Sequence, residues 1–200
     1  MSFAYDNPPD NGSIRQGEIL GPLWEHRPLT PPTKLEPGAE VPVQPVEHAV
    51  MVVLTPDCDL LWDFNARFVD EEARVALGPE SEAIATANAA VPHVLLCDAY
   101  DGVVVRSRFD AKLFKLASQN RDERYHYFPE AAVGDSGETL PEMFLDFKKP
   151  LAIPTNLLYE GLRIGGVRRL GWLPLVYRHD LIHRFFSFQS RIATPGPGAT

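Results

Sequence analysis

The sequence predicts a mainly β, α+β fold: a small, partly open β-barrel with a long Pro-rich insertion and a C-terminal helix. Several short apolar segments are separated by long irregular connections, as in small decorated barrels. Residues 174–192 carry apolar side chains at three- and four-residue steps, which is typical of a helix packed along one face. Long βαβ units are absent, which argues against a doubly wound α/β fold.

The elements follow from the apolar pattern and the prolines. Residues 48–55 form the clearest strand, because they are β-branched and apolar without alternation, and we expect both faces to be buried. We expect further strands at residues 14–20, 94–97, 125–128 and 143–147, and a helix at 109–118. Residues 157–164 and the glycines after them indicate either a hairpin or a short helix followed by a strand.

The length and composition indicate one globular domain. A chain of 200 residues, 44% hydrophobic and 23% charged, is that of an ordinary globular protein. We expect the domain over 14–193, with a flexible tail at 1–13 and another at 194–200. Within it, residues 69–90 are acidic and Ala-rich and predict a helical or mobile insert.

The prolines of residues 21–46 predict an extended loop or arm and not sheet or helix, because proline donates no hydrogen bond and fixes φ. Two interpretations stay open for this segment. It is either a polyproline segment that binds a partner or an irregular loop packed on the barrel.

The net charge and the cysteine content argue against several classes of protein. The net charge of −8 disfavours general binding to nucleic acids or anionic membranes. Two cysteines do not make a disulfide framework. The first ten residues lack the features of a secretory signal, and the longest apolar run is too short to span a bilayer. We therefore expect a cytoplasmic protein with no membrane partner.

The strongest candidate site is the segment Thr55-Pro56-Asp57-Cys58-Asp59, directly after the clearest strand. Such a position is rigid on one side and accessible on the other. Carboxylates on both sides of Cys58 disfavour its thiolate unless a cation lies near. Thr55, Asp57 and Asp59 are therefore candidate binding residues, and an acidic turn that caps the next segment is the alternative.

Two distant residues could complete a catalytic set with Cys58. His126 would act as base and Asp146 would orient it, as in nucleophilic hydrolases. The same region could instead hold zinc through Asp57, Cys58, Asp59 and His126. A third alternative is a buried His–Asp or Arg–Asp pair that stabilises adjacent strands. The spacing decides none of these, and we expect no metal and no cofactor.

Two further groups of side chains are candidate binding groups. His179 and His183 are four residues apart on the predicted last helix and so share a face, but metal binding would need another ligand. Arg163, Arg168 and Arg169 form either a small basic patch or ion pairs with the chain's own carboxylates.

Several strings carry a resemblance: GEI, VMVVLT, PDCDL, RYHYFP, LDFKKPLAIP and HRFFSFQSRI. Together they resemble a family of bacterial hypothetical proteins with a Cys-Asp pair after a buried strand, over most of residues 14–193. That resemblance implies no activity. More distantly, GEI and VMVVLT resemble the first strands of PemK/MazF-like toxins, over residues 14–60. This second resemblance implies a Src-homology-3-like barrel that cleaves RNA.

The toxin resemblance implies Arg27 and Thr55 as site residues. Thr55 falls where the toxins have Ser or Thr after the strand. In the toxins an Arg-Pro pair directly precedes that strand, whereas Arg27-Pro28 is separated from it here by the Pro-rich insert.

These observations lead to one main expectation and one alternative. We expect a bacterial accessory or regulatory protein that works through protein contacts, within a defence or signalling cassette. The alternative is an enzyme, either a MazF-like endoribonuclease or a cysteine- or metal-dependent hydrolase at residues 55–59. A binding protein predicts an exposed apolar patch, an RNase a basic groove, and a hydrolase Cys58 close to His126. The oligomeric state is not predicted.

Overall fold

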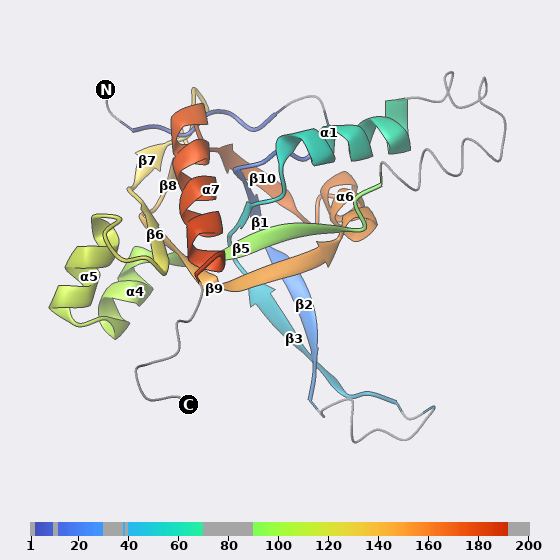
Figure 1. Ribbon diagram of the computed structural model, residues 1–200. Helices are drawn as coiled ribbons and strands as arrows, with labels where there is room; N and C mark the ends of the chain where they lie inside the picture. Colours follow the sequence, from blue (N-terminus) through green and yellow to red (C-terminus); the bar gives the residue numbers. More distant parts are fainter. Residues whose placement is uncertain (1–2, 10–11, 30–37, 39, 70–89, 192–200) are drawn as a thin grey trace, which may run out of the picture.

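The computed structural model describes residues 3–9, 12–29, 38, 40–69 and 90–191. Its centre is a six-stranded antiparallel sheet in the order β10-β1-β4-β5-β9-β6, which curls into a half-barrel (Figure 1). The strands are β1 (Glu18–Gly21), β4 (Met51–Val53), β5 (His93–Asp101), β6 (Tyr125–Phe128), β9 (Met143–Pro154) and β10 (Arg168–Trp172). The predicted α+β class with a curled sheet and a C-terminal helix is confirmed.

The middle strand of the half-barrel is buried on both faces, as its sequence predicts. Met51 and Val53 belong to one hydrophobic cluster, and Val52 and Leu54 to the other. All four side chains are at most 1% exposed. Because successive side chains of a strand point to opposite faces, an apolar run without alternation requires cover on both.

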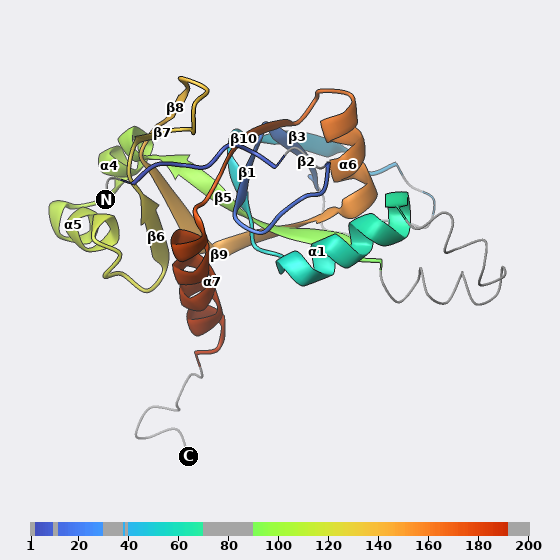
Figure 2. The same ribbon diagram turned by 90° about the horizontal axis from the view of Figure 1, so that it is seen from above.

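The helices supply that cover. They are α1 (Asp57–Phe64), which continues as a π-helical turn (Asn65–Val69), α4 (Gly102–Arg108), α5 (Ala111–Ser118), α6 (Thr155–Arg163) and α7 (Leu175–Gln189). Helix α7 lies across one face, while α1 and α6 lie together at the other end of the sheet (Figure 2). Helices α4 and α5 pack on the rings of β6 and β9. No helix of the described ranges is long and apolar enough to cross a membrane.

The Pro-rich segment differs from the predicted loop. It contains a two-stranded ribbon, β2 (Leu23–Pro28) and β3 (Val43–His48), which projects from the half-barrel (Figure 1). A strand of such a ribbon has one unpaired edge, where a proline removes no ladder bond. Where the ribbon leaves the sheet, a Cβ on Gly21 would lie 2.1 Å from the Ala49 carbonyl oxygen, so this crossing requires glycine. Residues 30–37 and 39 of the predicted insertion lie outside the described residues.

The N-terminal segment is also more ordered than the tail predicted for residues 1–13. Tyr5 is 1% exposed and forms a β-bridge to Val133, and Asp6 forms one to Trp172. Burial of an aromatic ring stabilises this segment, and the prediction of a loose tail is wrong for residues 3–9.

Another short hairpin joins β7 (Ala131–Ala132) to β8 (Thr139–Leu140). Residues 70–89 of the predicted insert and the tail at 194–200 lie outside the described residues.

Candidate functional site

The Thr55–Asp59 segment is the passage from the central strand into helix α1. Thr55 is buried, and its hydroxyl accepts a hydrogen bond of 2.7 Å from the Leu95 amide. Asp57 and Asp59 lie in the first helical turn, where the unpaired N–H groups and the helix dipole favour negative charge. Cys58 is exposed, and its thiol donates to Asp59 Oδ1 at 3.5 Å.

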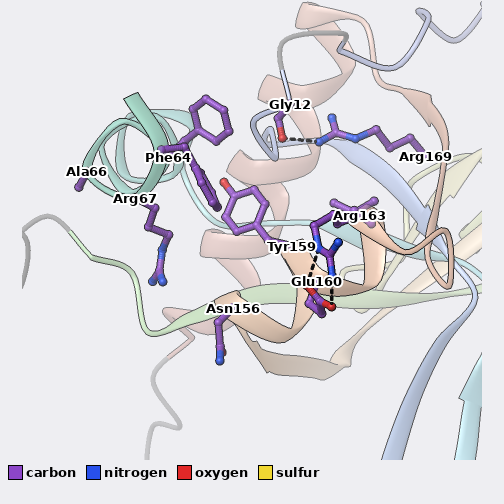
Figure 3. Close-up of a pocket in the computed structure, with 11 residues that line it drawn as sticks. Gly12, Phe64, Ala66, Arg67, Asn156, Tyr159, Glu160, Arg163 and Arg169 are labelled. Carbon is purple, nitrogen blue, oxygen red and sulfur yellow. Dashed lines mark hydrogen bonds and ion pairs between the residues drawn. The ribbon is translucent and has the colours of Figure 1, made fainter. Parts of the chain in front are cut away.

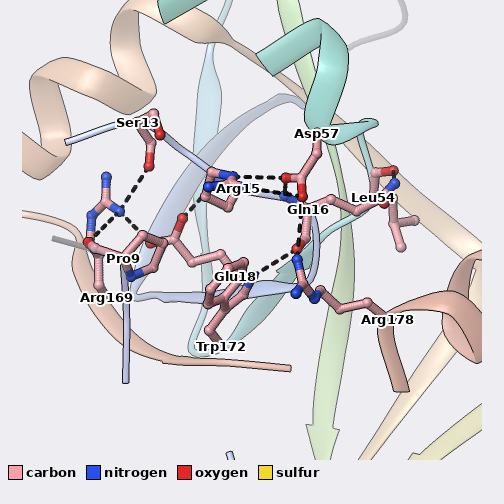
Figure 4. A network of polar contacts seen from close by, with 10 residues as sticks. All are labelled: Pro9, Ser13, Arg15, Gln16, Glu18, Leu54, Asp57, Arg169, Trp172 and Arg178. Atoms are coloured by element: carbon pink, nitrogen blue, oxygen red, sulfur yellow. Dashed lines mark hydrogen bonds and ion pairs between the residues drawn. The ribbon is translucent and has the colours of Figure 1, made fainter. Parts of the chain in front are cut away.

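Asp57 is the centre of a network of charged side chains (Figure 4). Arg15 donates to it twice, from Nε to Oδ1 and from Nη2 to Oδ2, each at 3.1 Å. The backbone amide of Gln16 donates to Asp57 Oδ1 at 2.7 Å, and Arg178 Nη1 donates to Asp57 Oδ2 at 3.3 Å. Both carboxylate oxygens therefore bind the protein's own donors, and Asp57 joins α1 and α7 to the segment before β1.

Trp172 forms the base of this network. The Arg178 guanidinium lies 4.0 Å from the centre of a Trp172 ring, and that of Arg15 lies 5.3 Å away. The indole N–H donates to the Gln16 carbonyl at 2.9 Å. Cation–π contact thus fixes the two arginines in the orientation that Asp57 needs.

A second ion pair lies beside the network. Glu18 is fully buried, 2.9 Å from Arg169 Nη1, and it accepts from the Arg15 amide at 2.9 Å. Burial raises the pKa of the Glu18 carboxyl to about 7, although Arg169 acts to lower it. Arg169 also donates to the carbonyls of Pro9, Gly12 and Ser13. The prediction that arginines of this group pair with the chain's own carboxylates is confirmed for Arg169, which pairs with Glu18, and for Arg163, which pairs with Glu160.

The three residues of the predicted catalytic set are not joined by hydrogen bonds in the described part of the chain. His126 is 1% exposed beneath α7, against Phe128 and Phe147. Burial lowers the pKa of His126 to about 3, so its imidazole is neutral. Asp146 accepts from Arg124 Nε at 2.7 Å and pairs across the sheet with Tyr125, so it lies on the opposite face from His126. The arrangement of Asp146 is the Arg–Asp pair of the third alternative.

The residues implied by the toxin resemblance lie apart. Arg27 belongs to the ribbon, opposite Gln44, and its Nε donates to Glu25 at 2.7 Å. Thr55 follows the far end of β4, and its hydroxyl is bound to the backbone of β5. The structure therefore does not bring Arg27 and Thr55 into one site.

The candidate metal ligands lie on three separate elements: residues 57–59 on α1, His126 on β6, and His179 and His183 on α7. His179 and His183 are both exposed on α7. Within the residues that the structure describes, no group of three or more His, Cys, Asp or Glu side chains is placed to hold a metal ion.

A groove of about 830 Å³ lies between the π-helical turn after α1 and helix α6 (Figure 3). Three rings form its walls: Phe68 lies 5.2 Å from Phe64 and 5.1 Å from Tyr159, measured between ring centres. Phe68 is 56% exposed. The lining residues are Gly12, Phe64, Ala66, Arg67, Phe68, Asn156, Tyr159, Glu160, Leu162, Arg163 and Arg169.

The three arginines of the groove differ in how they are held. Arg67 donates to the buried Asp63 carboxylate at 2.7 Å and to the Val91 carbonyl at 3.2 Å. Arg169 is held by Glu18 and three carbonyls, as described above. Arg163 pairs with Glu160, but its side chain is 71% exposed. Because exposed ion pairs contribute little, Arg163 is the groove arginine that can most easily change partner.

Sequence reasoning did not find this groove. A signal is present in Phe64 and Phe68, which are four residues apart after the Cys-Asp pair and so share a helical face. Tyr159, which completes the ring cluster, belongs to a segment for which both a hairpin and a helix stayed open. The π-helical turn that opens the groove is of a kind often found at functional sites.

Comparison with known proteins adds no relative: no protein-family model, curated sequence or solved structure matches the chain.

Proposed function

We propose that the protein is an accessory or regulatory binding protein and that the groove beside α1 and α6 receives a segment of a partner protein. The observation that carries this proposal is the open, ring-lined groove of about 830 Å³. Concave sites lined by aromatic side chains with a few polar groups are the usual form of a binding site. The exposed ring of Phe68 would be covered on binding, which favours association.

The chemistry of the groove favours one kind of partner segment: a large apolar side chain next to a carboxylate. The rings of Phe64, Phe68 and Tyr159 suit the apolar side chain. The lining residues include three arginines and one glutamate, although the whole chain carries a net charge of −8. Each of these arginines has a carboxylate partner in the chain, so their charges are largely balanced. The exposed Arg163 at the rim is the arginine that can exchange Glu160 for the carboxylate of a partner.

The same contacts argue against a phosphate-rich ligand. The donors of Arg67 and Arg169 are largely committed to the protein's own carboxylates and carbonyls. A nucleotide or RNA strand would find few converging free donors here, whereas nucleic-acid affinity depends on many such contacts.

Synthetic peptides test the proposal. The probe is a short fluorescent peptide with Leu and Phe flanked by Asp and Glu; matched peptides carry Lys in place of the acids or Ala in place of the apolar residues. We expect the acidic apolar peptide to bind most tightly by fluorescence anisotropy. Phe68→Ser should weaken it about tenfold or more, because a central aromatic contact is lost. Leu157→Ser, on an exposed part of α6 outside the groove lining, is the matched control and should bind like the wild type.

Charge reversal sharpens the test. Arg163→Glu should invert the preference between the acidic and the Lys-substituted peptide. Equal binding of all three peptides, or binding unaffected by Phe68→Ser, would overturn the proposal. Displacement of the peptide by a single-stranded oligoribonucleotide that binds more tightly would replace it with an RNA-binding function.

A further inference from the structure

The outer edge of β2 is unpaired within the part of the chain that the structure describes. β2 pairs with β3 alone, and the two strands form a sheet of their own that projects from the half-barrel (Figure 1). Four of the six side chains of β2 are exposed. A strand edge with free backbone groups is a template for pairing with another strand, and proteins usually block such edges. The residues along this edge therefore decide whether it is blocked or open.

The backbone groups of Trp24 and His26 face this outer edge. The Leu29 amide donates to the Pro42 carbonyl at 2.9 Å, which is toward β3. Because the backbone groups of successive residues in a strand point to opposite edges, the even-numbered residues of β2 point away from β3. Pro28, the last of these residues, lacks an N–H but keeps its carbonyl. The outer edge of β2 thus offers both donors and acceptors to a further strand.

The outer edge of β3 is blocked at its middle. Pro45 lies opposite His26, so its backbone also faces away from the ribbon. Proline has no N–H, and a further strand would find no donor at this point. Of the two edges of the ribbon, the edge of β2 is the one that another strand can pair with.

The side chains of β2 suit a second copy of the same strand. Glu25 and Arg27 are two residues apart and share a face, with His26 between them. In an antiparallel pair of two copies with His26 at the centre, Glu25 of each copy lies opposite Arg27 of the other. Trp24, which is 55% exposed, then lies opposite Pro28 of the other copy. Opposite charges and ring contacts between facing residues stabilise a pair of strands.

The neighbouring registers bring like charges together. Two identical antiparallel strands pair about a central residue, because outward-facing backbone groups must meet outward-facing ones. A centre at Glu25 places that carboxylate opposite its own copy, and a centre at Arg27 does the same with the guanidinium. Like charges that face each other directly destabilise a strand pair. Charge therefore selects the register centred on His26.

We infer that the protein forms a weak homodimer in which β2 pairs antiparallel with β2 of a second copy, joining the two ribbons into one four-stranded sheet. Within each chain Arg27 Nε already lies 2.7 Å from Glu25 Oε2, so the four charges alternate around the two-fold axis. One short strand edge buries less than the roughly 1,600 Å² of a standard interface, and the dimer is weak for that reason. The surface shares no residue with the partner groove, so the inference does not rest on the proposed function.

Sedimentation equilibrium of the full chain tests the dimer. We expect the mass to rise from that of one chain toward that of two as the concentration increases from about 1 μM to about 1 mM. His26→Pro removes an outward N–H and no bond to β3, and it should raise the dissociation constant about tenfold or more. Val43→Pro removes an outward N–H from the edge of β3 and should dimerise like the wild type. A single-chain mass at every concentration, or unchanged dimerisation of His26→Pro, would overturn the inference.

Charge exchange tests the register. Arg27→Glu and Glu25→Arg each place like charges opposite one another, so each variant alone should stay monomeric. Mixed in equal amounts, the two variants restore opposite charges at both positions and should form a heterodimer. A mixture that stays monomeric, while both variants unfold as cooperatively as the wild type, would contradict this register.

Disulfide formation locates the two-fold axis without altering these charges. In a chain that carries Cys58→Ser, His26→Cys should give a covalent dimer under mild oxidation, because the two residues face each other across the axis. Gln44→Cys, on β3, lies one strand farther from the axis in each copy and should stay monomeric. Cys97 is buried and does not take part. Equal cross-linking of the two variants would mean that the chains meet in another way and would overturn the inference.

Discussion

Arg15 and Asp57 form a two-pronged ion pair, in which Nε and Nη2 of the arginine each lie 3.1 Å from a different carboxylate oxygen. This geometry is the strongest form of an arginine–carboxylate contact. It fixes the start of helix α1 against the segment that leads into β1. Helix α1 in turn leads into the π-helical turn of the groove, so the network fixes the first end of this helix and the proposed binding site lies at its other end.

Removing the Asp57 carboxylate should destabilise the fold. Asp57→Ala leaves Arg15 and Arg178 without their shared partner and the Gln16 amide without an acceptor. We expect a loss of about 2–3 kcal/mol in the free energy of unfolding, measured by urea denaturation. Asp59→Ala, in the same helical turn, should cost less than about 1 kcal/mol. Equal losses in the two variants would mean that only the helix dipole is involved.

Gly17 should tolerate no side chain. Its φ is +76°, and a Cβ would lie 2.4 Å from Arg178 Cγ. Gly17→Ala should therefore combine backbone strain with displacement of Arg178. Gly137 has the same φ of +76° but open space around it, so Gly137→Ala measures the backbone strain alone. We expect Gly137→Ala to cost about 1 kcal/mol and Gly17→Ala clearly more in urea unfolding. A Gly17→Ala loss no larger than that of the control would contradict the tight packing.

Glu18 should make the protein less stable as the pH rises. The native carboxyl has a pKa of about 7, above the ordinary value of 4.5, so the native state binds its proton more tightly than the unfolded state. The contribution of Glu18 to the free energy of unfolding therefore falls between pH 4.5 and 7 and is constant above that range. Glu18→Gln should remove a slope of about 1.4 kcal/mol per pH unit from the unfolding free energy. Identical slopes in variant and wild type would show that Glu18 does not titrate in this way.

His126 should act in the opposite direction. Its native pKa of about 3 lies below the ordinary value of 6.5, so the unfolded state binds the proton more tightly. The contribution of the neutral His126 ring to the free energy of unfolding is complete above pH 6.5 and is lost as the pH falls toward 3. His126→Phe should keep the buried ring and remove this acid sensitivity in thermal unfolding between about pH 4 and 6. His183→Phe, at an exposed position of α7, serves as control and should keep the wild-type acid sensitivity.

The apolar pattern predicted the parts of the fold that burial dictates. The central strand, the strand at residues 125–128 and the helices near 109–118 and 174–192 follow from local periodicity. The strand that starts at Met143 runs past Pro150 to Pro154, although the proline suggested an earlier end. The ribbon does not follow from the sequence for the same reason: proline disfavours a strand in general, but the unpaired edges of a two-stranded ribbon accommodate it.

The candidate site was predicted only in part. The position of Thr55–Asp59 at the end of the central strand is a local property and could be found from sequence. The partners of Asp57 could not, because Arg15 and Arg178 come from opposite ends of the chain and meet only through the fold. The predicted set of Cys58, His126 and Asp146 depended on such long-range convergence, for which the spacing held no information.

The pairing of β1 with β10 has a consequence for how the protein acquires its structure. Glu18 near the start of the chain lies opposite Trp172 near its end, so one edge of β1 is covered only when most of the chain is available. Pairings between residues so distant in sequence are formed slowly, since a large loop must close before they contribute. We therefore expect one edge of β1 to stay unpaired during synthesis on the ribosome until β10 has been made, so that the half-barrel is completed only after that strand is available.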